Sequence, residues 1–418
     1  MRARAHTQMS GSNSTVSKWS WGETHIDWKV IGPYTLPGYS HKNCAAAYQL
    51  DPTFGRIKTD TLVLLMGPLV AWKRGHSTRA YDYNIFWLPR CNQPGYVYGG
   101  KAEIGNREMI MRGPLPSHQL AAEFREDQAG LFSAVVAHEM GHMYGAYHAS
   151  CINNNNRGSV AWCDTHVKNV SLACNTSGAV LTEYCAPQTI MGYTINRNQP
   201  LGHQMDGWAH RAYFVMSRIT FGWADTLRYP VLVSKIDFDH ATDRYMGCDP
   251  NCSFRLQRSD AASLDKNASV VIILQTTHST SNGDRYFVFE HRLNNTYDIR
   301  STTSMLLIHS TDLQRNIGRP PGVYGNKEQV QLYRNTKGAK DIMVRTYGPT
   351  FLTDCTPNTS SWDDSGCALG QSIELDTGHE DAPMKMRVHV HPALLESGKL
   401  LKVTLSQVVG RGQGLARR

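Results

Sequence analysis

The side chains best suited to chemistry lie in one short stretch of the chain, which reads VVAHEMGHMYGAYH. It contains the pattern H-E-x-x-H-x-x-G-x-x-H, formed by His138, Glu139, His142, Gly145 and His148. Because residues four apart on a helix project from the same face, His138 and His142 can bind one metal ion. A glycine one turn later can take a positive φ, end the helix and bring His148 back as a third imidazole. The spacing therefore predicts a metal site made of three histidines.

Three neutral histidines leave the fourth position of a tetrahedral zinc ion open, which is the catalytic rather than the structural arrangement. Glu139 follows the first histidine directly and is expected to act as a general base, which takes the proton of the attacking water and passes it to the leaving amine. Zinc lowers the pKa of such a water to about 7 and polarises a carbonyl group. The pattern thus predicts one catalytic Zn²⁺ and hydrolysis of an amide bond.

A metal-free helix and a structural zinc site both account for the motif less well. A buried helix with ordinary core histidines would place four polar groups among Val, Ala, Met and Leu side chains, which costs several kcal/mol of desolvation without a metal. A structural zinc site would not need Glu139, and it would usually recruit cysteine.

The motif needs a buried helix and a sheet to hold it. Residues 128–144 are apolar nearly all round, which is typical of a helix at the centre of a domain. Before it, apolar and aromatic runs bounded by Gly and Pro predict strands at residues 61–66, 83–88, 96–104 and 108–111.

The rest of the chain divides by composition. Residues 1–55 are polar and form an N-terminal segment, which could be the remnant of a prosegment. Residues 56–226 contain the motif, a Cys- and Asn-rich stretch expected to be a loop (149–190) and a predicted helix (205–219). Residues 227–418 show short β-rich runs separated by turn residues, as in a β-sandwich. The expected fold class is α+β, with a twisted mixed sheet and an active-site helix followed by a β-sandwich-like domain.

The motif resembles that of the metzincin metalloproteases, and within them the chain is most similar to the gametolysin family (peptidase M11). The namesake of that family digests a cell-wall glycoprotein. It has Gln at the place of the first histidine, whereas this chain has His138. Beyond the motif, the similarity rests on residues 83–89, 95–105, 191–192, 221–223, 286–292 and 305–309.

The resemblance implies roles for four further residues. Met191 would lie in the tight methionine turn below the zinc, and Tyr193 would reach the metal or the developing oxyanion; an ordinary half-buried tyrosine explains that position equally well. The strand that carries Gly100 and Ala102 would pair with the main chain of the substrate, although a simple hairpin bend is an equal alternative.

Cysteine content and glycosylation sequons indicate the compartment. The chain has 10 cysteines, and N-x-[ST] occurs at Asn13, Asn169, Asn175, Asn267, Asn294 and Asn358. Together they favour an oxidising, secretory route. No signal peptide is visible at the N-terminus, which we expect to be truncated or processed.

The composition excludes several classes of protein. The net charge of +8 is spread over 418 residues without a basic block, so we expect no nucleic-acid partner. No apolar stretch is long enough for a transmembrane helix.

The sequence therefore predicts a secreted zinc endopeptidase whose partners are extracellular or cell-wall proteins and glycoproteins. The alternatives are a non-catalytic adhesion or carbohydrate-binding protein with a vestigial zinc site, and a zinc hydrolase of non-peptide amides.

Overall fold

The structure is a computed structural model of the chain. It describes residues 2–35, 59–88, 100–102, 106–112, 128–146, 148–153, 180–182, 188–192, 212–223, 229–239, 242, 244–248, 251–261, 263–280, 283–293, 303–314, 347–352, 366–377, 384–395 and 399–408.

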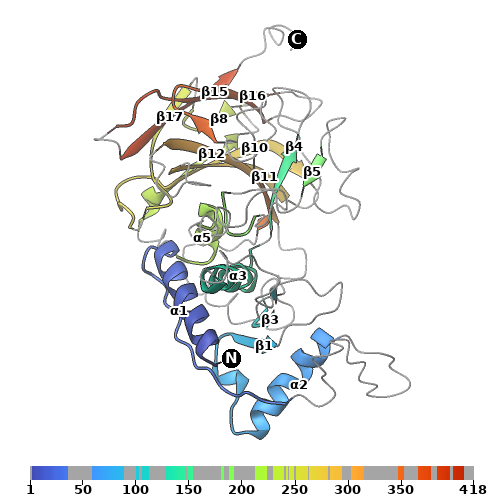
Figure 1. The fold of residues 1–418 in the computed structure, drawn as a ribbon. Coiled ribbons are helices and arrows are strands. Elements are labelled where there is room, and N and C mark those ends of the chain that lie inside the picture. The colour runs from blue at the N-terminus through green and yellow to red at the C-terminus, as the bar shows by residue number, and fades with distance from the viewer. Residues whose placement is uncertain are drawn as a thin grey trace.

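The described part of the molecule is a stack of sheets and helices with the motif helix near its middle (Figure 1). From one end of the stack to the other lie a small sheet, a larger sheet, helix α5, helix α3 and a second small sheet. The expected α+β class is confirmed, with several sheets and few helices among the described residues.

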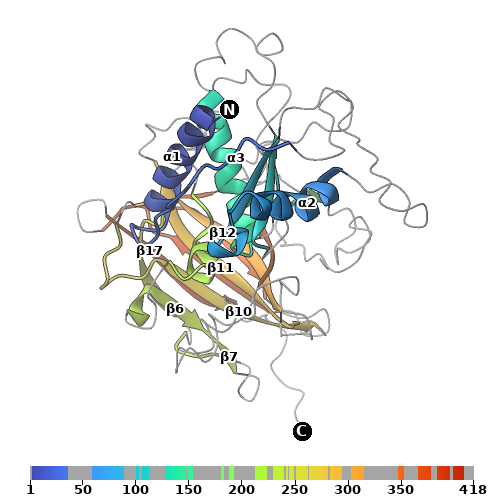
Figure 2. The same cartoon turned by 90° about the horizontal axis from the view of Figure 1, so that it is seen from below.

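Helix α3 spans Gln128–Met143, as the apolar pattern predicts. Helix α1 (Arg2–Trp19) lies alongside it (Figure 2). Buried residues of α1 recur three and four apart, at Ala5, Met9, Ser12, Val16 and Trp19, and Gln8 and Thr15 are buried beside them, which gives the helix one buried, mostly apolar face. That face packs on α3, so the polar N-terminal region contains a helix that supports the motif.

Close approach of the two helices depends on small side chains. The Ser12 hydroxyl donates a hydrogen bond to the Ser133 carbonyl of α3 (3.0 Å), and the Ser133 hydroxyl donates to the Gln8 carbonyl of α1 (3.1 Å). A Cβ added at Gly11 would lie 2.2 Å from the Ser133 Oγ, so only glycine fits there.

A three-stranded sheet lies on the other side of α3. Its strands are β1 (Asn84–Leu88), β2 (Gly100–Ala102) and β3 (Glu108–Arg112), in the order β1-β3-β2. The strands β1 and β3 are parallel and β2 is antiparallel to β3, so the sheet is mixed, as expected. Strand β2 is at the edge of this described sheet.

The prediction of a strand at residues 61–66 is wrong. These residues belong to helix α2 (Thr59–Lys73), which packs beside β1 and β3 and is followed by the short helix η1 (Thr78–Ala80). A short apolar run fits a buried strand and a buried helix equally well, and Gly67-Pro68, which suggested a strand end, lies inside this helix. Gly67 is required there because a Cβ would lie 2.5 Å from the Phe86 ring of β1.

The larger sheet has eight strands in the order β5-β4-β13-β12-β11-β10-β6, with β14 paired to β12. Their bounds are β4 Ala149–Asn153, β5 Val180–Thr182, β6 Val233–Ile236, β10 Val271–Thr280, β11 Gly283–Leu293, β12 Ser304–Gln314, β13 Tyr347–Leu352 and β14 Cys367–Ala368. Within the stretch expected to be a loop, β4 and β5 form strands, and β4 runs parallel to β13. The sheet therefore contains strands from both sides of the proposed boundary near residue 226.

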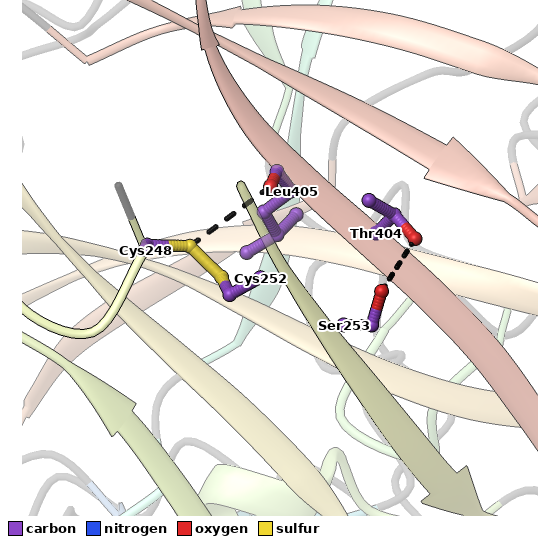
Figure 3. Close-up of a disulfide and its surroundings, with 5 residues drawn as sticks. All are labelled: Cys248, Cys252, Ser253, Thr404 and Leu405. Carbon is purple, nitrogen blue, oxygen red and sulfur yellow. Dashed lines mark hydrogen bonds between the residues drawn. A yellow bond between two sulfur atoms is a disulfide. The ribbon is translucent and has the colours of Figure 1, made fainter. Parts of the chain in front are cut away.

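One face of the larger sheet packs on a four-stranded sheet in the order β15-β16-β17-β9. Its strands are β9 Asn251–Gln257, β15 Ser372–Asp376, β16 Lys385–Val390 and β17 Leu400–Val408. A disulfide joins Cys248 to Cys252 at the start of β9, and the Ser253 hydroxyl is hydrogen-bonded to that of Thr404 across β9 and β17 (Figure 3).

The opposite face of the larger sheet packs on helix α5 (Val215–Thr220). This helix occupies the end of the stretch predicted to be helical (205–219). The prediction is wrong at residues 212–214, which precede α5 without helical structure, and residues 205–211 lie outside the described residues. The remaining elements are the short helix η5 (Pro230–Leu232) and the two-stranded pair β7 (Phe238–Asp239) and β8 (Arg244–Tyr245).

Candidate metal centre

The C-terminal end of α3 turns at Gly145, as the motif predicts. The Ala146 N–H donates to the Gly141 carbonyl (2.8 Å) and the Gly145 N–H donates to the His142 carbonyl (2.9 Å). This pair of bonds is the Schellman arrangement, which places its left-handed residue just past the helix end. Gly145 has φ +109°, which a residue with a side chain adopts only with strain. The turn returns the chain toward the helix and carries His148 with it.

The structure brings the three predicted histidines together. One ligand atom from each of His138, His142 and His148 lies within 4.8 Å of the other two, and this cluster could hold a metal ion. The Nε2 atoms of His142 and His148 are 2.9 Å apart. The three rings therefore converge on one point, as the ligands of a single metal ion must.

Backbone carbonyls orient the two helix histidines. The Nδ1 of His138 is 2.7 Å from the Ile190 carbonyl oxygen, and the Nδ1 of His142 is 2.7 Å from the Ala146 carbonyl oxygen. Because a carbonyl can only accept, each Nδ1 carries the proton and each Nε2 keeps its lone pair. These contacts fix the tautomer in which Nε2 is free to bind a metal ion.

Burial keeps His138 and His148 neutral. Desolvation and the neighbouring His142 lower the pKa of His138 to about 3, against an opposing hydrogen bond to the Ile190 carbonyl. The same two causes lower the pKa of His148 to about 3. At neutral pH both imidazoles are therefore already in the deprotonated form that binds metal.

The lowered pKa values of the buried histidines predict how the stability of the metal-free protein changes with pH. His138, His148 and His309 have pKa values lowered to about 3, and His291 to about 4, in each case chiefly by burial. Between these values and the ordinary histidine pKa, the unfolded chain binds more protons than the folded chain, so the free energy of unfolding falls as the pH falls. Glu139, whose pKa is raised to about 7, acts in the opposite direction but is a single group. We expect the melting temperature to fall between about pH 7 and about pH 5; a rise over that range would contradict this assignment.

Glu139 lies in a closed space under the edge strand β2. It is 7% exposed, and a Cβ added at Gly100 would lie 2.6 Å from its Cγ and 2.9 Å from its Oε1. Desolvation raises the pKa of Glu139 to about 7, while a hydrogen bond from the Ala102 backbone opposes the rise. Gly100 and Ala102, expected to contact substrate, thus also surround the carboxylate that the motif assigns as base.

Met191 lies in a turn beneath α3, where the Gly192 N–H donates to the Thr189 carbonyl (3.0 Å). It is 2% exposed, and its sulfur would be 2.4 Å from a Cβ added at Gly141 in the middle of α3. The turn also supplies the carbonyl of Ile190 that orients His138. The candidate methionine turn therefore contacts the motif helix at Gly141 and at His138.

Tyr213 is a residue of the centre that the sequence pattern does not reveal. Its hydroxyl donates to the Ala137 carbonyl, one residue before His138, and its ring lies against Gly141. A single tyrosine in an otherwise apolar run gives no signal of such a contact. Tyr193, by contrast, lies outside the described residues.

Comparisons with known protein families, curated proteins and solved structures found no match to this chain.

Proposed function

We propose that the chain is a secreted, zinc-dependent endopeptidase, similar in its motif to the metzincins and most similar to the gametolysin family. The observation that carries the proposal is the cluster of His138, His142 and His148 with Glu139 on the same helix. Extracellular or cell-wall proteins and glycoproteins are the proposed substrates, on the basis of the family resemblance alone.

The residues present fit a zinc ion. Among the described residues, the donor set is three imidazoles without a cysteine, as in catalytic zinc sites. His138 and His142 offer Nε2 because their Nδ1 atoms are bonded to carbonyls. When bound there, zinc would supply Lewis-acid polarisation of the scissile carbonyl and an increased acidity of water.

The protein's own groups would then manage the proton and the substrate. Glu139 would accept a proton at its carboxylate and later donate it to the leaving amine. The edge strand β2, which carries Gly100 and Ala102, would hold the substrate main chain by strand pairing. Met191 would underlie the site, and Tyr193 would reach the metal or the developing oxyanion.

Secretion is supported by disulfide formation and by one exposed sequon. Cys248 and Cys252 form a disulfide, and Cys367 is also disulfide-bonded. Asn267, which begins an N-x-[ST] sequence, lies exposed on a turn. Both features are typical of proteins that pass through an oxidising compartment. None of the helices found in the described residues could cross a membrane.

Digestion of casein or gelatin by the purified full chain tests the proposal. We expect cleavage that stops when a chelator removes the metal and returns when Zn²⁺ is added, with a bound zinc content near one per chain. A protein that binds zinc but leaves both substrates intact would favour the adhesion or carbohydrate-binding alternative. Cleavage that is insensitive to complete metal removal would refute the assigned chemistry.

A further inference from the structure

An arginine of the larger sheet is hydrogen-bonded to the two segments that pack beneath the metal centre. Arg292 lies on β11, in the sheet that packs against α5 (Figure 1), and is 3% exposed. Its Nη1 donates to the Gln188 carbonyl (2.6 Å) and to the Ala212 carbonyl (3.5 Å), and its Nη2 donates to the Tyr213 carbonyl. One guanidinium therefore ties together two segments that lie 104 and 80 residues away from it in the sequence.

Both segments support His138. Gln188 directly precedes the turn that carries Ile190 and Met191, and the Ile190 carbonyl orients the His138 ring at 2.7 Å. The two segments are also joined to each other, because the Ile190 N–H donates to the Ala212 carbonyl at 3.4 Å. The Tyr213 hydroxyl bonds the carbonyl that precedes His138 on α3. Arg292 thus binds the main chain of both segments that contact His138 or the residue before it.

A buried carboxylate fixes the arginine in turn. Glu290 is 0% exposed, and its Oε2 lies 3.1 Å from the Arg292 Nε. The same oxygen accepts hydrogen bonds from the Ser259 hydroxyl (2.7 Å) and from the Val215 N–H at the start of α5 (3.2 Å). The carboxylate is therefore bonded to Arg292 on its own strand and to two other segments of the chain.

Stability alone does not account for this pair. Burying two charges costs desolvation, and well-packed apolar residues of similar volume are often as stable or more so. What apolar side chains cannot provide is a planar group with donors at fixed angles, which holds several carbonyls in one geometry. The arrangement is suited to positioning.

We propose that Arg292 is a positioning residue for the metal centre. It acts on the His138 ring through the turn at residues 188–192 and through Tyr213. The proposal rests on the proposed function only in that the histidine cluster binds zinc. It implies that the metal centre depends on a residue of the larger sheet, far from the motif in the sequence.

The test compares Zn²⁺ affinity and the visible absorption of the Co²⁺-substituted full chain in three variants. Arg292→Lys keeps the positive charge beside Glu290, but the three donors of its ammonium share one nitrogen and cannot reproduce the planar fork that reaches the carbonyls from two separate nitrogens. The double variant Arg292→Met with Glu290→Gln removes both buried charges and leaves no unpaired carboxylate. The control is Arg387→Lys, which alters the exposed ion pair with Glu374 (2.6 Å) on the outer sheet.

We expect a loss of Zn²⁺ affinity of about 10-fold or more in Arg292→Lys and in the double variant, with an altered Co²⁺ spectrum, and no change in the control. A lower melting temperature combined with wild-type Zn²⁺ affinity and a wild-type Co²⁺ spectrum would show a merely structural role and would overturn the proposal. Failure of the proposed function is a different result, because the unmodified chain would then bind no zinc or would cleave no protein.

Discussion

Replacing Glu139 with glutamine is expected to lower kcat of protein cleavage by about 10²–10⁴-fold while zinc stays bound, because the carboxamide cannot accept the proton that a general base must take. Gly100 of β2 lies directly against the Glu139 side chain, so a replacement must have the same size. Glutamine has nearly the same shape, and its carbonyl oxygen can still accept the hydrogen bond from the Ala102 backbone. The measurement is casein digestion at saturating substrate, together with the zinc content of both proteins.

A matched control separates the loss of this particular carboxylate from a general effect of changing a glutamate to glutamine. Glu374→Gln removes a carboxylate that is paired with Arg387 on the exposed face of the outer sheet, and we expect it to leave kcat unchanged. Full activity of the Glu139→Gln protein would show that another group takes the proton. Loss of zinc from that protein would show that Glu139 supports the metal instead.

Local patterns predicted the motif helix and two strands of the neighbouring sheet, because these elements depend on residues close in sequence. The three histidines and Gly145 fall within one helix and one turn, so their spacing determines which face they share. The strands at residues 84–88 and 108–112 were also predicted, since each is a short apolar run bounded by turn residues. The run at residues 61–66 lacked any periodicity that separates a helix from a strand, and there the prediction was wrong.

Such local patterns could not predict contacts between segments that are distant in the sequence. Strand β4 follows the third histidine directly and runs parallel to β13, about which the local sequence of neither strand carries information. The hydrogen bonds of Arg292 to Gln188 and Tyr213 are of the same kind. Helix α1 was not predicted either, because Gly11 and Ser12 interrupt the apolar residues on the face that meets α3.

Gly141 is explained only when its local sequence and its distant contacts are considered together. Glycine inside a helix costs roughly 1 kcal/mol relative to alanine, so its presence in the middle of α3 requires a compensating reason. The structure supplies it: a Cβ there would lie 2.4 Å from the Met191 sulfur and 2.7 Å from the Tyr213 Cε1. Both of these side chains are almost fully buried and have little room to move.

The second large effect is therefore expected from Gly141→Val. Overpacking of a buried contact costs about 1–3 kcal/mol, and a β-branched side chain in place of glycine adds three carbon atoms at a site that has no space for the first of them. Displacement of Met191 moves the turn whose Ile190 carbonyl orients His138, so we expect zinc affinity to fall together with the free energy of unfolding. Urea unfolding of the metal-free protein and zinc titration measure the two effects.

A double-mutant cycle identifies the contact responsible. Met191→Ala removes the sulfur that the new Cβ would meet, and on its own it should cost about 2–5 kcal/mol by leaving a cavity. If the two side chains compete for the same space, Gly141→Val with Met191→Ala will be more stable than the sum of the single effects predicts, by about 1 kcal/mol or more. If the two effects are strictly additive, the valine does not compete with Met191 for space. That result would contradict the contact between Met191 and Gly141 of α3.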